Sequence, residues 1–225
     1  MGVRRNRHIP ELNPTGLQAQ TAQISTLNSL IESDEKGWLN VKKESGKIIS
    51  IAKYCRVKYH GYNRDKSREL FTIVDWPNQN TKASVSAISK TKSRFDFIQY
   101  KAGGSLVFEK AKNRLKYGNS NWIHTSTDPS NPMPKGTHNL WVPDYLHEGG
   151  EGYTNVAKYA TVWFRIGAEK SSRYLHVGNF SAGCVTVGEK STGGKDADKK
   201  KWDDIYNYLV KCRSSVELVG KIKVI

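Results

Sequence analysis

The chain has 225 residues, of which 37 % are hydrophobic and 10 % aromatic. This composition supports a packed core and excludes a globally disordered chain, and the length allows one large domain or a small domain beside a larger one. There are 36 Lys and Arg residues against 21 Asp and Glu, a formal net charge of +15. Such a surface favours an anionic partner (nucleic acid, anionic lipid or an acidic cell-wall polymer) without choosing among them.

The cysteines and the apolar segments restrict where the protein is made. Cys55, Cys184 and Cys212 are an odd number and form neither a disulfide framework nor a zinc-binding pair. A chain that needs no disulfide fits synthesis in a reducing compartment. Arg4 and Arg5 resemble the start of a twin-arginine leader, but no apolar segment follows them. We therefore expect synthesis in the cytoplasm without a signal peptide, and no membrane span.

An amphipathic helix is predicted near the N-terminus, over about residues 16–33. Thr15 can serve as its N-cap, and Gln18, three residues later, completes a capping box. Apolar residues then recur at near-helical spacing: Leu17, Ile24, Leu27, Leu30 and Ile31. The chain next changes to short β-branched and aromatic runs that are typical of strands. We predict residues 1–93 as an N-terminal extension, in which the strands of 38–92 either form a small β module or add to one larger sheet.

Residues 94–225 are predicted as a second domain, and the fold class of the chain as mainly β, a β-rich α+β fold with a few short helices. A helix over 200–212 is predicted from apolar residues at i, i+3, i+4 and i+7: Trp202, Ile205, Tyr206 and Leu209. A long segment rich in Asn, Ser, Pro and Gly precedes it, and long loops inside compact domains are typical of binding rims. Trp141 and Tyr145 lie in this segment, where they line a substrate groove or simply pack.

One short stretch carries candidate chemistry: it runs from His176 to Cys184 and contains Gly178, Ser181 and Gly183. A thiol with an ordinary pKa of about 8.5 is mostly protonated at neutral pH, so a neighbouring histidine must take its proton. A strand that ends at His176, followed by a tight glycine turn, would bring Cys184 back beside it. The amides of Gly183 and Cys184 could then bind an oxyanion, a contribution of about 3–4 kcal/mol per donor. By residue type alone, a structural cysteine and histidine also fit.

This stretch resembles the active-site signature of the L,D-transpeptidase (YkuD-like) family. His176-Val-Gly and Ser181-Ala-Gly-Cys-Val are similar to its histidine–glycine pair and its Ser/Thr-x-Gly-Cys string. The segment 132–137 is similar to the family's Pro-x-Pro-x-Gly segment, and the helix after the cysteine and the strands of 216–225 are similar to its C-terminal end. The resemblance covers about residues 94–225 and implies an L,D-transpeptidase-like β-sandwich with a few short helices.

The resemblance also implies the chemistry. Cys184 would attack a peptidoglycan stem peptide and His176 would accept its proton, with a backbone carbonyl just after the histidine holding the other ring nitrogen. Gly183, Ser181 and Gly178 would support the turn and the oxyanion. The resulting thioester would react with an amine (transpeptidation), a free D-amino acid (exchange) or water (carboxypeptidation). No cofactor and no metal is implied.

The stretch departs from the family's common form at three points. Ala182 stands where a histidine is usual, Thr186 stands where arginine or asparagine is usual, and Cys184 comes only eight positions after His176. Short intervals with Ser-x-Gly-Cys resemble the branch of interbacterial toxins delivered by type VI secretion. That resemblance implies an antibacterial effector made in the bacterial cytoplasm, which acts in the periplasm or cell wall after specialised secretion, with a cognate immunity protein as a partner.

A metal site is an alternative use of the histidines. Three histidines and two carboxylates lie in or near the long polar segment: His124, His138, His147, Asp144 and Glu148. Their spacings match no zinc motif, so solvated loop residues are the better interpretation.

A basic binding module without catalysis is the alternative function from a different class. The net charge and interleaved aromatic residues would suit a nucleic-acid backbone or an anionic wall polymer. The sequence contains no recognised nucleic-acid-binding motif, and this interpretation leaves the His176–Cys184 stretch unexplained, so nucleic acid is not the expected partner. Binding would survive Cys184→Ala, whereas acyl transfer would not.

Overall fold

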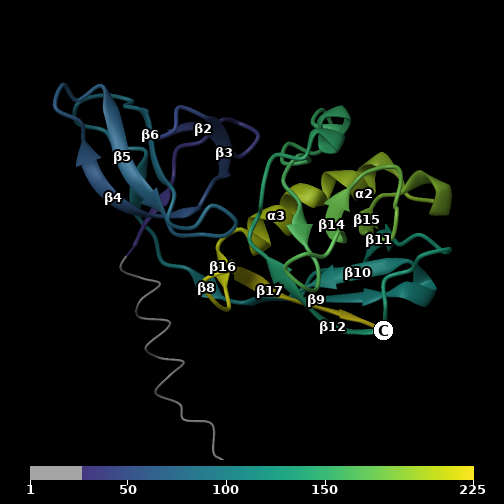
Figure 1. The fold of residues 1–225 in the computed structure, drawn as a ribbon. Coiled ribbons are helices and arrows are strands. Elements are labelled where there is room, and N and C mark those ends of the chain that lie inside the picture. Colours follow the sequence, from purple (N-terminus) through teal and green to yellow (C-terminus); the bar gives the residue numbers. More distant parts are fainter. Residues whose placement is uncertain (1–26) are drawn as a thin grey trace, which may run out of the picture.

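The computed structural model describes residues 27–225 and shows a mainly β chain with a few short helices (Figure 1). This confirms the predicted fold class. The part of the predicted N-terminal helix that precedes residue 27 lies outside the described residues. Two large sheets contain most of the strands, and each is associated with its own apolar core.

The first sheet has seven strands in the order β3-β2-β6-β5-β4-β1-β7. In chain order they are β1 (Asn28–Leu30), β2 (Trp38–Lys43), β3 (Ile48–Ala52), β4 (Arg56–Tyr62), β5 (Arg68–Ile73), β6 (Lys82–Ser86) and β7 (Phe95–Phe97). Side chains alternate between the core and solvent, as strand geometry requires: Phe71 and Ile73 are buried whereas Leu70 is exposed. These strands form a small β module, one of the two arrangements that the sequence left open.

Strand β1 replaces the end of the predicted helix. It pairs with β4 on one side and with β7 on the other, and Leu30 is fully buried in the core of the module. The helix prediction is wrong for β1 because strand pairing and the burial of Leu30 outweigh a weak local preference. Since β7 belongs to this sheet, the module extends to Phe97, and the predicted boundary after residue 93 is too early.

The second sheet has eight strands in the order β12-β17-β9-β10-β11-β15-β14-β13. They are β9 (Gly104–Glu109), β10 (Arg114–Tyr117), β11 (Ile123–Ser126), β12 (Gly136–Trp141), β13 (Phe164–Arg165), β14 (Tyr174–Val177), β15 (Val185–Val187) and β17 (Leu218–Val224). The sheet curls until its edges meet, where Leu140 of β12 forms a bridge with Ile166, just after β13. Its two halves therefore enclose one apolar core in a sandwich-like arrangement.

Short helices and a small parallel strand pair complete the second domain. The helices are α2 (Asp196–Lys200) and α3 (Trp202–Leu209), the pair is β8 (Lys101–Ala102) with β16 (Cys212–Arg213), and 3₁₀ turns occur at Lys110–Lys112, Glu148–Tyr153 and Lys190–Thr192. The apolar side of α3 packs into the core through Trp202, Ile205, Tyr206 and Leu209, as predicted. Within residues 27–225, no helix is long and apolar enough to cross a membrane.

Two predictions about this C-terminal region need correction. The helix predicted over 200–212 is interrupted at Lys201 and ends at Leu209, because the chain then turns to pair β16 with β8. Cys212 is therefore a buried strand residue. The closing strands predicted over 216–225 are a single strand, β17, which lies between β12 and β9.

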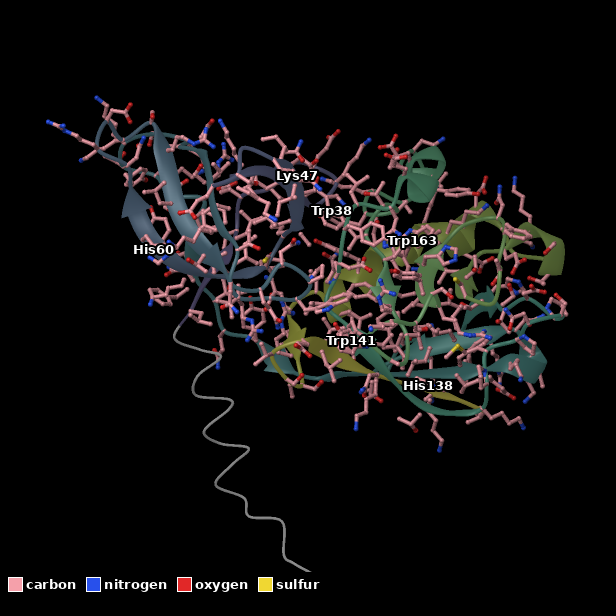
Figure 2. The ribbon with its side chains drawn as sticks, in the orientation of Figure 1. Trp38, Lys47, His60, His138, Trp141 and Trp163 are labelled. Atoms are coloured by element: carbon pink, nitrogen blue, oxygen red, sulfur yellow. The ribbon has the colours of Figure 1, made fainter. Side chains whose placement is uncertain are left out.

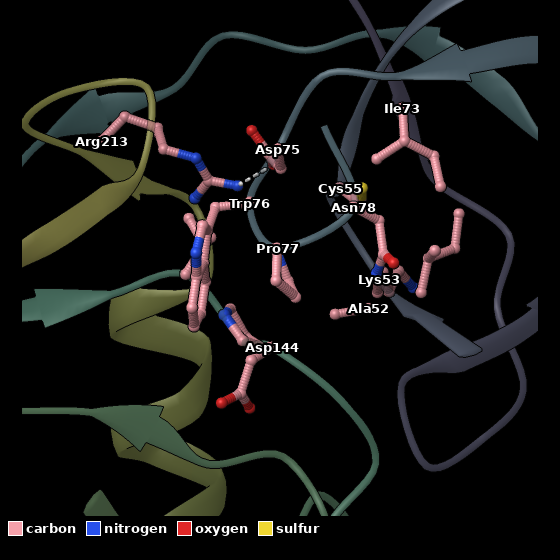
Figure 3. Close-up of a pocket in the computed structure, with 13 residues that line it drawn as sticks. Ala52, Lys53, Cys55, Ile73, Asp75, Trp76, Pro77, Asn78, Asp144 and Arg213 are labelled. Carbon is pink, nitrogen blue, oxygen red and sulfur yellow. Dashed lines mark hydrogen bonds and ion pairs between the residues drawn. The ribbon is translucent and has the colours of Figure 1, made fainter. Parts of the chain in front are cut away.

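A buried ion cluster joins the β module to the second domain. Arg56 Nε lies 2.7 Å from Asp75 Oδ1, and Arg213 Nη2 lies 3.4 Å from Asp75 Oδ2. All three side chains are at least nine-tenths buried. Asp75 and Arg213 line a cavity of about 10 Å³, room for one water molecule (Figure 3). Trp38 adds a hydrogen bond from its indole N–H to Thr161 Oγ1 at 3.1 Å, so the module is fixed against its neighbour.

Candidate active site

Parallel pairing of β14 with β15 brings the predicted histidine and cysteine together. Leu175 is opposite Val185 and His176 is opposite Thr186. Cys184, the residue just before β15, is therefore opposite Tyr174. Because side chains alternate along a strand, Tyr174 and His176 share one face of the sheet with Cys184 and Thr186. Only residues 178–184 connect these two parallel strands, a short connection for such a pair.

The hydrogen bonds of His176 fix its tautomer. Nδ1 lies 3.0 Å from the carbonyl oxygen of Val177, which can only accept, so Nδ1 carries the proton. The unprotonated Nε2 then accepts a hydrogen bond from the Thr186 hydroxyl at 3.0 Å. Burial lowers the pKa of His176 to about 4, so the ring is neutral at neutral pH. The resting ring therefore has the lone pair on Nε2 that a general base requires.

The thiol of Cys184 is held at the start of β14. Sγ accepts a hydrogen bond from the Tyr174 backbone N–H at 3.4 Å, and the side chain is 8 % exposed. Burial raises the pKa of Cys184, although the Tyr174 N–H and the charge of Arg173 oppose this rise. In the described structure no hydrogen bond joins this thiol to His176. The resting pair is thus a neutral thiol and a neutral imidazole, and proton transfer must accompany attack.

The turn before Cys184 is built around a glycine with left-handed backbone. Gly183 has φ +88°, and a Cβ there would lie 2.8 Å from Asn131 Nδ2. On one side of the cysteine, Arg173 donates to the Gly183 carbonyl at 2.5 Å; on the other, Ser181 Oγ donates to the Cys184 carbonyl at 3.0 Å. Among the described residues, the N–H groups of Gly183 and Cys184 have no acceptor. These two amides are available for an oxyanion.

Gly178 has a backbone role on the histidine side of the site. It is buried, and its N–H continues the ladder by donating to the Val187 carbonyl at 3.3 Å. A Cβ at this position would lie 3.6 Å from the His176 ring, an ordinary contact. The glycine therefore extends the pairing of β14 with β15 beyond Val177, and its N–H is already bonded.

A stack of rings that the sequence did not reveal supports His176. Trp163 lies between His176 and His147, with ring centroids 4.3 Å and 4.2 Å away. His147 Nε2 is 2.9 Å from Asp144 Oδ1, and the Asp144 carboxylate also accepts from the Tyr174 hydroxyl at 2.9 Å. The only sequence signal for this arrangement was the three-residue spacing of Asp144 and His147. The position of Trp163 between the two histidines follows from the fold alone.

The two aromatic residues predicted for a substrate rim have different environments. Trp141 is buried, with its indole N–H bonded to the Gly167 carbonyl at 2.9 Å and its ring against Trp76, and it lies away from Trp163 (Figure 2). Trp141 therefore packs against Trp76, and its place at a substrate rim stays a prediction. Tyr145 is 52 % exposed and borders an open groove of about 410 Å³ between the β module and its own loop.

Comparisons with known proteins give only distant likenesses. No family model matches the sequence, and no curated protein matches it. An L,D-transpeptidase from Mycobacterium tuberculosis H37Rv has a TM-score of 0.34 and 11 % identity, over 96 % of this chain and 87 % of that one. An L,D-transpeptidase from Mycobacterium smegmatis has a TM-score of 0.34 and 10 % identity, over the same shares of the two chains. Likenesses of this size do not carry a functional assignment, which depends on the residues of the site.

The buried neutral His176 predicts a loss of stability in acid. Its pKa is about 4 in the folded chain and about 6.5 when unfolded, so below about pH 6.5 the unfolded state binds the extra proton. The free energy of unfolding should fall by about 3 kcal/mol from this group between about pH 6.5 and pH 4. Urea unfolding across this range should show a shallower pH dependence for His176→Gln than for wild type. His60→Gln, at an exposed position of β4, is the control, and equal slopes for His176→Gln and wild type would contradict the assignment.

Proposed function

We propose that the chain is a cysteine acyl-transfer enzyme of the L,D-transpeptidase type that acts on peptidoglycan stem peptides. One observation carries the proposal: His176 lies on β14 and Cys184 directly precedes β15, the parallel neighbour of β14, with His176 Nδ1 held by the Val177 carbonyl. The open amides of Gly183 and Cys184 add the donors that acyl transfer requires. The resemblance of the surrounding stretch to the family's signature names the substrate class.

The proposed reaction starts from the neutral pair. As Sγ of Cys184 bonds to the carbonyl carbon of the L-centred diamino acid, its proton passes to Nε2 of His176. The two amides bind the oxyanion, the C–N bond to the terminal D-alanine breaks, and His176 returns the proton to the leaving amine. The thioester is then attacked by an amine or by water, again with His176 as base. In this scheme the thiol must replace the Thr186 hydroxyl at Nε2, a consequence of threonine at a position where the family often has arginine or asparagine.

The proposed biological role is that of an antibacterial effector that reaches the periplasm by specialised secretion and is blocked by an immunity protein. Its support is the Ser-x-Gly-Cys string with a short His-to-Cys interval, together with a basic surface suited to an anionic wall. Periplasmic expression in a Gram-negative host should stop growth for the wild type and not for Cys184→Ala. Equal growth of the two strains at matched protein levels would remove the effector role.

Mass spectrometry of stem peptides tests the enzymatic proposal. Purified disaccharide-tetrapeptides, with a free D-amino acid other than D-alanine, are incubated with wild type, with Cys184→Ala, and with Cys212→Ala as a matched loss of another buried thiol. Loss of one D-alanine, a crosslinked dimer or a D-amino-acid exchange product should appear with wild type and Cys212→Ala only. An unchanged tetrapeptide with folded wild type would refute the proposed substrate, and a product with Cys184→Ala would refute the nucleophile.

A further inference from the structure

The side chain of Arg173 bridges the cysteine turn to a second loop. Nη1 donates to the Gly183 carbonyl at 2.5 Å and to the Asn131 carbonyl at 3.1 Å, while Nη2 donates to Asn131 Oδ1 at 2.6 Å. All three acceptors are neutral oxygens, and within residues 27–225 no carboxylate pairs with this guanidinium. Its role is therefore unlike that of Arg56, Arg165 or Arg213, each of which is paired with an aspartate.

The bond to the Gly183 carbonyl determines the direction of the next N–H. The peptide between Gly183 and Cys184 is trans and planar, so its N–H points opposite to its carbonyl. A glycine with positive φ tolerates many orientations of this peptide, because no Cβ restricts it. The turn does not by itself fix the direction of the Cys184 N–H. The Arg173 guanidinium fixes it by holding the Gly183 carbonyl.

We propose that Arg173 is a positioning residue, which turns the Gly183–Cys184 peptide so that the Cys184 N–H faces the developing oxyanion. The inference rests on the proposed acyl-transfer function and adds a residue that lies outside the Ser-x-Gly-Cys string. A rigid two-pronged donor is needed, because the guanidinium must hold the Gly183 carbonyl and Asn131 at once. A lysine at position 173 would keep the positive charge, but its single ammonium group could not hold the Gly183 carbonyl and both Asn131 oxygens in this geometry.

Two thiol reagents separate peptide orientation from thiol ionisation. Acylation by 4-nitrophenyl acetate passes through a tetrahedral oxyanion, forms the S–C bond and releases 4-nitrophenolate, with the thiol proton going to His176 or solvent. Alkylation by iodoacetamide is a direct displacement without an oxyanion and reports only thiolate fraction and access. The ratio of the two rate constants at Cys184, mapped by peptide mass spectrometry over a Cys184→Ala background, isolates oxyanion stabilisation. Neither reagent contains a stem peptide, so the test stands even if peptidoglycan is not the substrate.

The expected result is a fall in the acylation-to-alkylation ratio of about 10- to 100-fold for Arg173→Met, somewhat below the loss of a whole oxyanion donor. Arg173→Lys should keep alkylation near wild type and still lower the ratio. Asn131→Ala removes only the hydrogen bond from Arg173 Nη2 to Asn131 Oδ1 and should give a smaller fall in the ratio. This variant replaces Arg173→Met in the test if Arg173→Met does not fold. Arg114→Met, on β10 and paired with Glu109, is the matched control. A ratio within about twofold of wild type in folded Arg173 variants, or wild-type acylation no faster than the Cys184→Ala background, would overturn the proposal.

Discussion

Replacing His176 with glutamine is expected to lower kcat for stem-peptide turnover by about 10²- to 10⁴-fold, with little change in KM. Glutamine fits the space of the ring and can keep a hydrogen bond to the Val177 carbonyl, but its amide cannot accept the thiol proton. Since the resting thiol is neutral and its pKa is raised by burial, attack without this base starts from a very small thiolate fraction. Steady-state kinetics with a defined tetrapeptide, read by release of D-alanine, measures the effect.

The control for this change is His138→Gln, on β12, where the ring bonds only to the Pro134 carbonyl within the described structure. It should retain wild-type kcat. The kcat of His176→Gln should recover partly at high pH, where hydroxide deprotonates the thiol directly. A folded His176→Gln enzyme with kcat within about tenfold of wild type would exclude His176 as the base.

Replacing Asp75 with alanine is expected to lower the free energy of unfolding by about 3–5 kcal/mol, because it leaves two buried guanidinium groups without their carboxylate. Arg56 and Arg213 both contact Asp75. The other hydrogen-bond acceptors of Arg213 in the described structure are backbone carbonyls. The loss should appear as a lower urea midpoint. It should also loosen the β module from the second domain, since Arg56 and Asp75 belong to one and Arg213 to the other.

A surface ion pair provides the comparison for Asp75. Glu44 and Lys82 are 3.6 Å apart and both strongly exposed, so Glu44→Ala should change the free energy of unfolding by less than about 1 kcal/mol. Amide hydrogen exchange can locate the effect of Asp75→Ala at the junction between the sheets. If Asp75→Ala is no more destabilising than Glu44→Ala, the buried cluster does not hold the two parts together.

Local patterns predicted the strands and the helix around Trp202, but not the elements set by distant contacts. The helical spacing up to Ile31 is real in the sequence, yet Leu30 is buried by pairing β1 between β4 and β7. The same effect moves the module's end from residue 93 to Phe97, since β7 has a partner more than sixty residues earlier in the chain. Partners of that kind leave no periodicity in a single sequence.

The candidate site also has features that the sequence predicted and features that only tertiary contacts establish. The spacing of His176, Gly183 and Cys184 predicted a strand, a glycine turn and a return to the strand's side, which is what the parallel pair β14–β15 provides. Trp163 and Arg173 could not be predicted, because neither belongs to the signature and each acts through a three-dimensional contact. The neutral state of the Cys–His pair was also beyond reach, since it follows from burial.

The central claim, that Cys184 forms a thioester with a stem peptide, is tested most directly by intact-protein mass spectrometry. The protein is mixed with a disaccharide-free tetrapeptide, quenched in acid within seconds and digested to map the adduct. We predict a mass increase equal to the tripeptide less one water, located on Cys184 and absent in Cys184→Ala. An adduct on Cys55 or Cys212, or turnover of the peptide by the Cys184→Ala enzyme, would contradict the account.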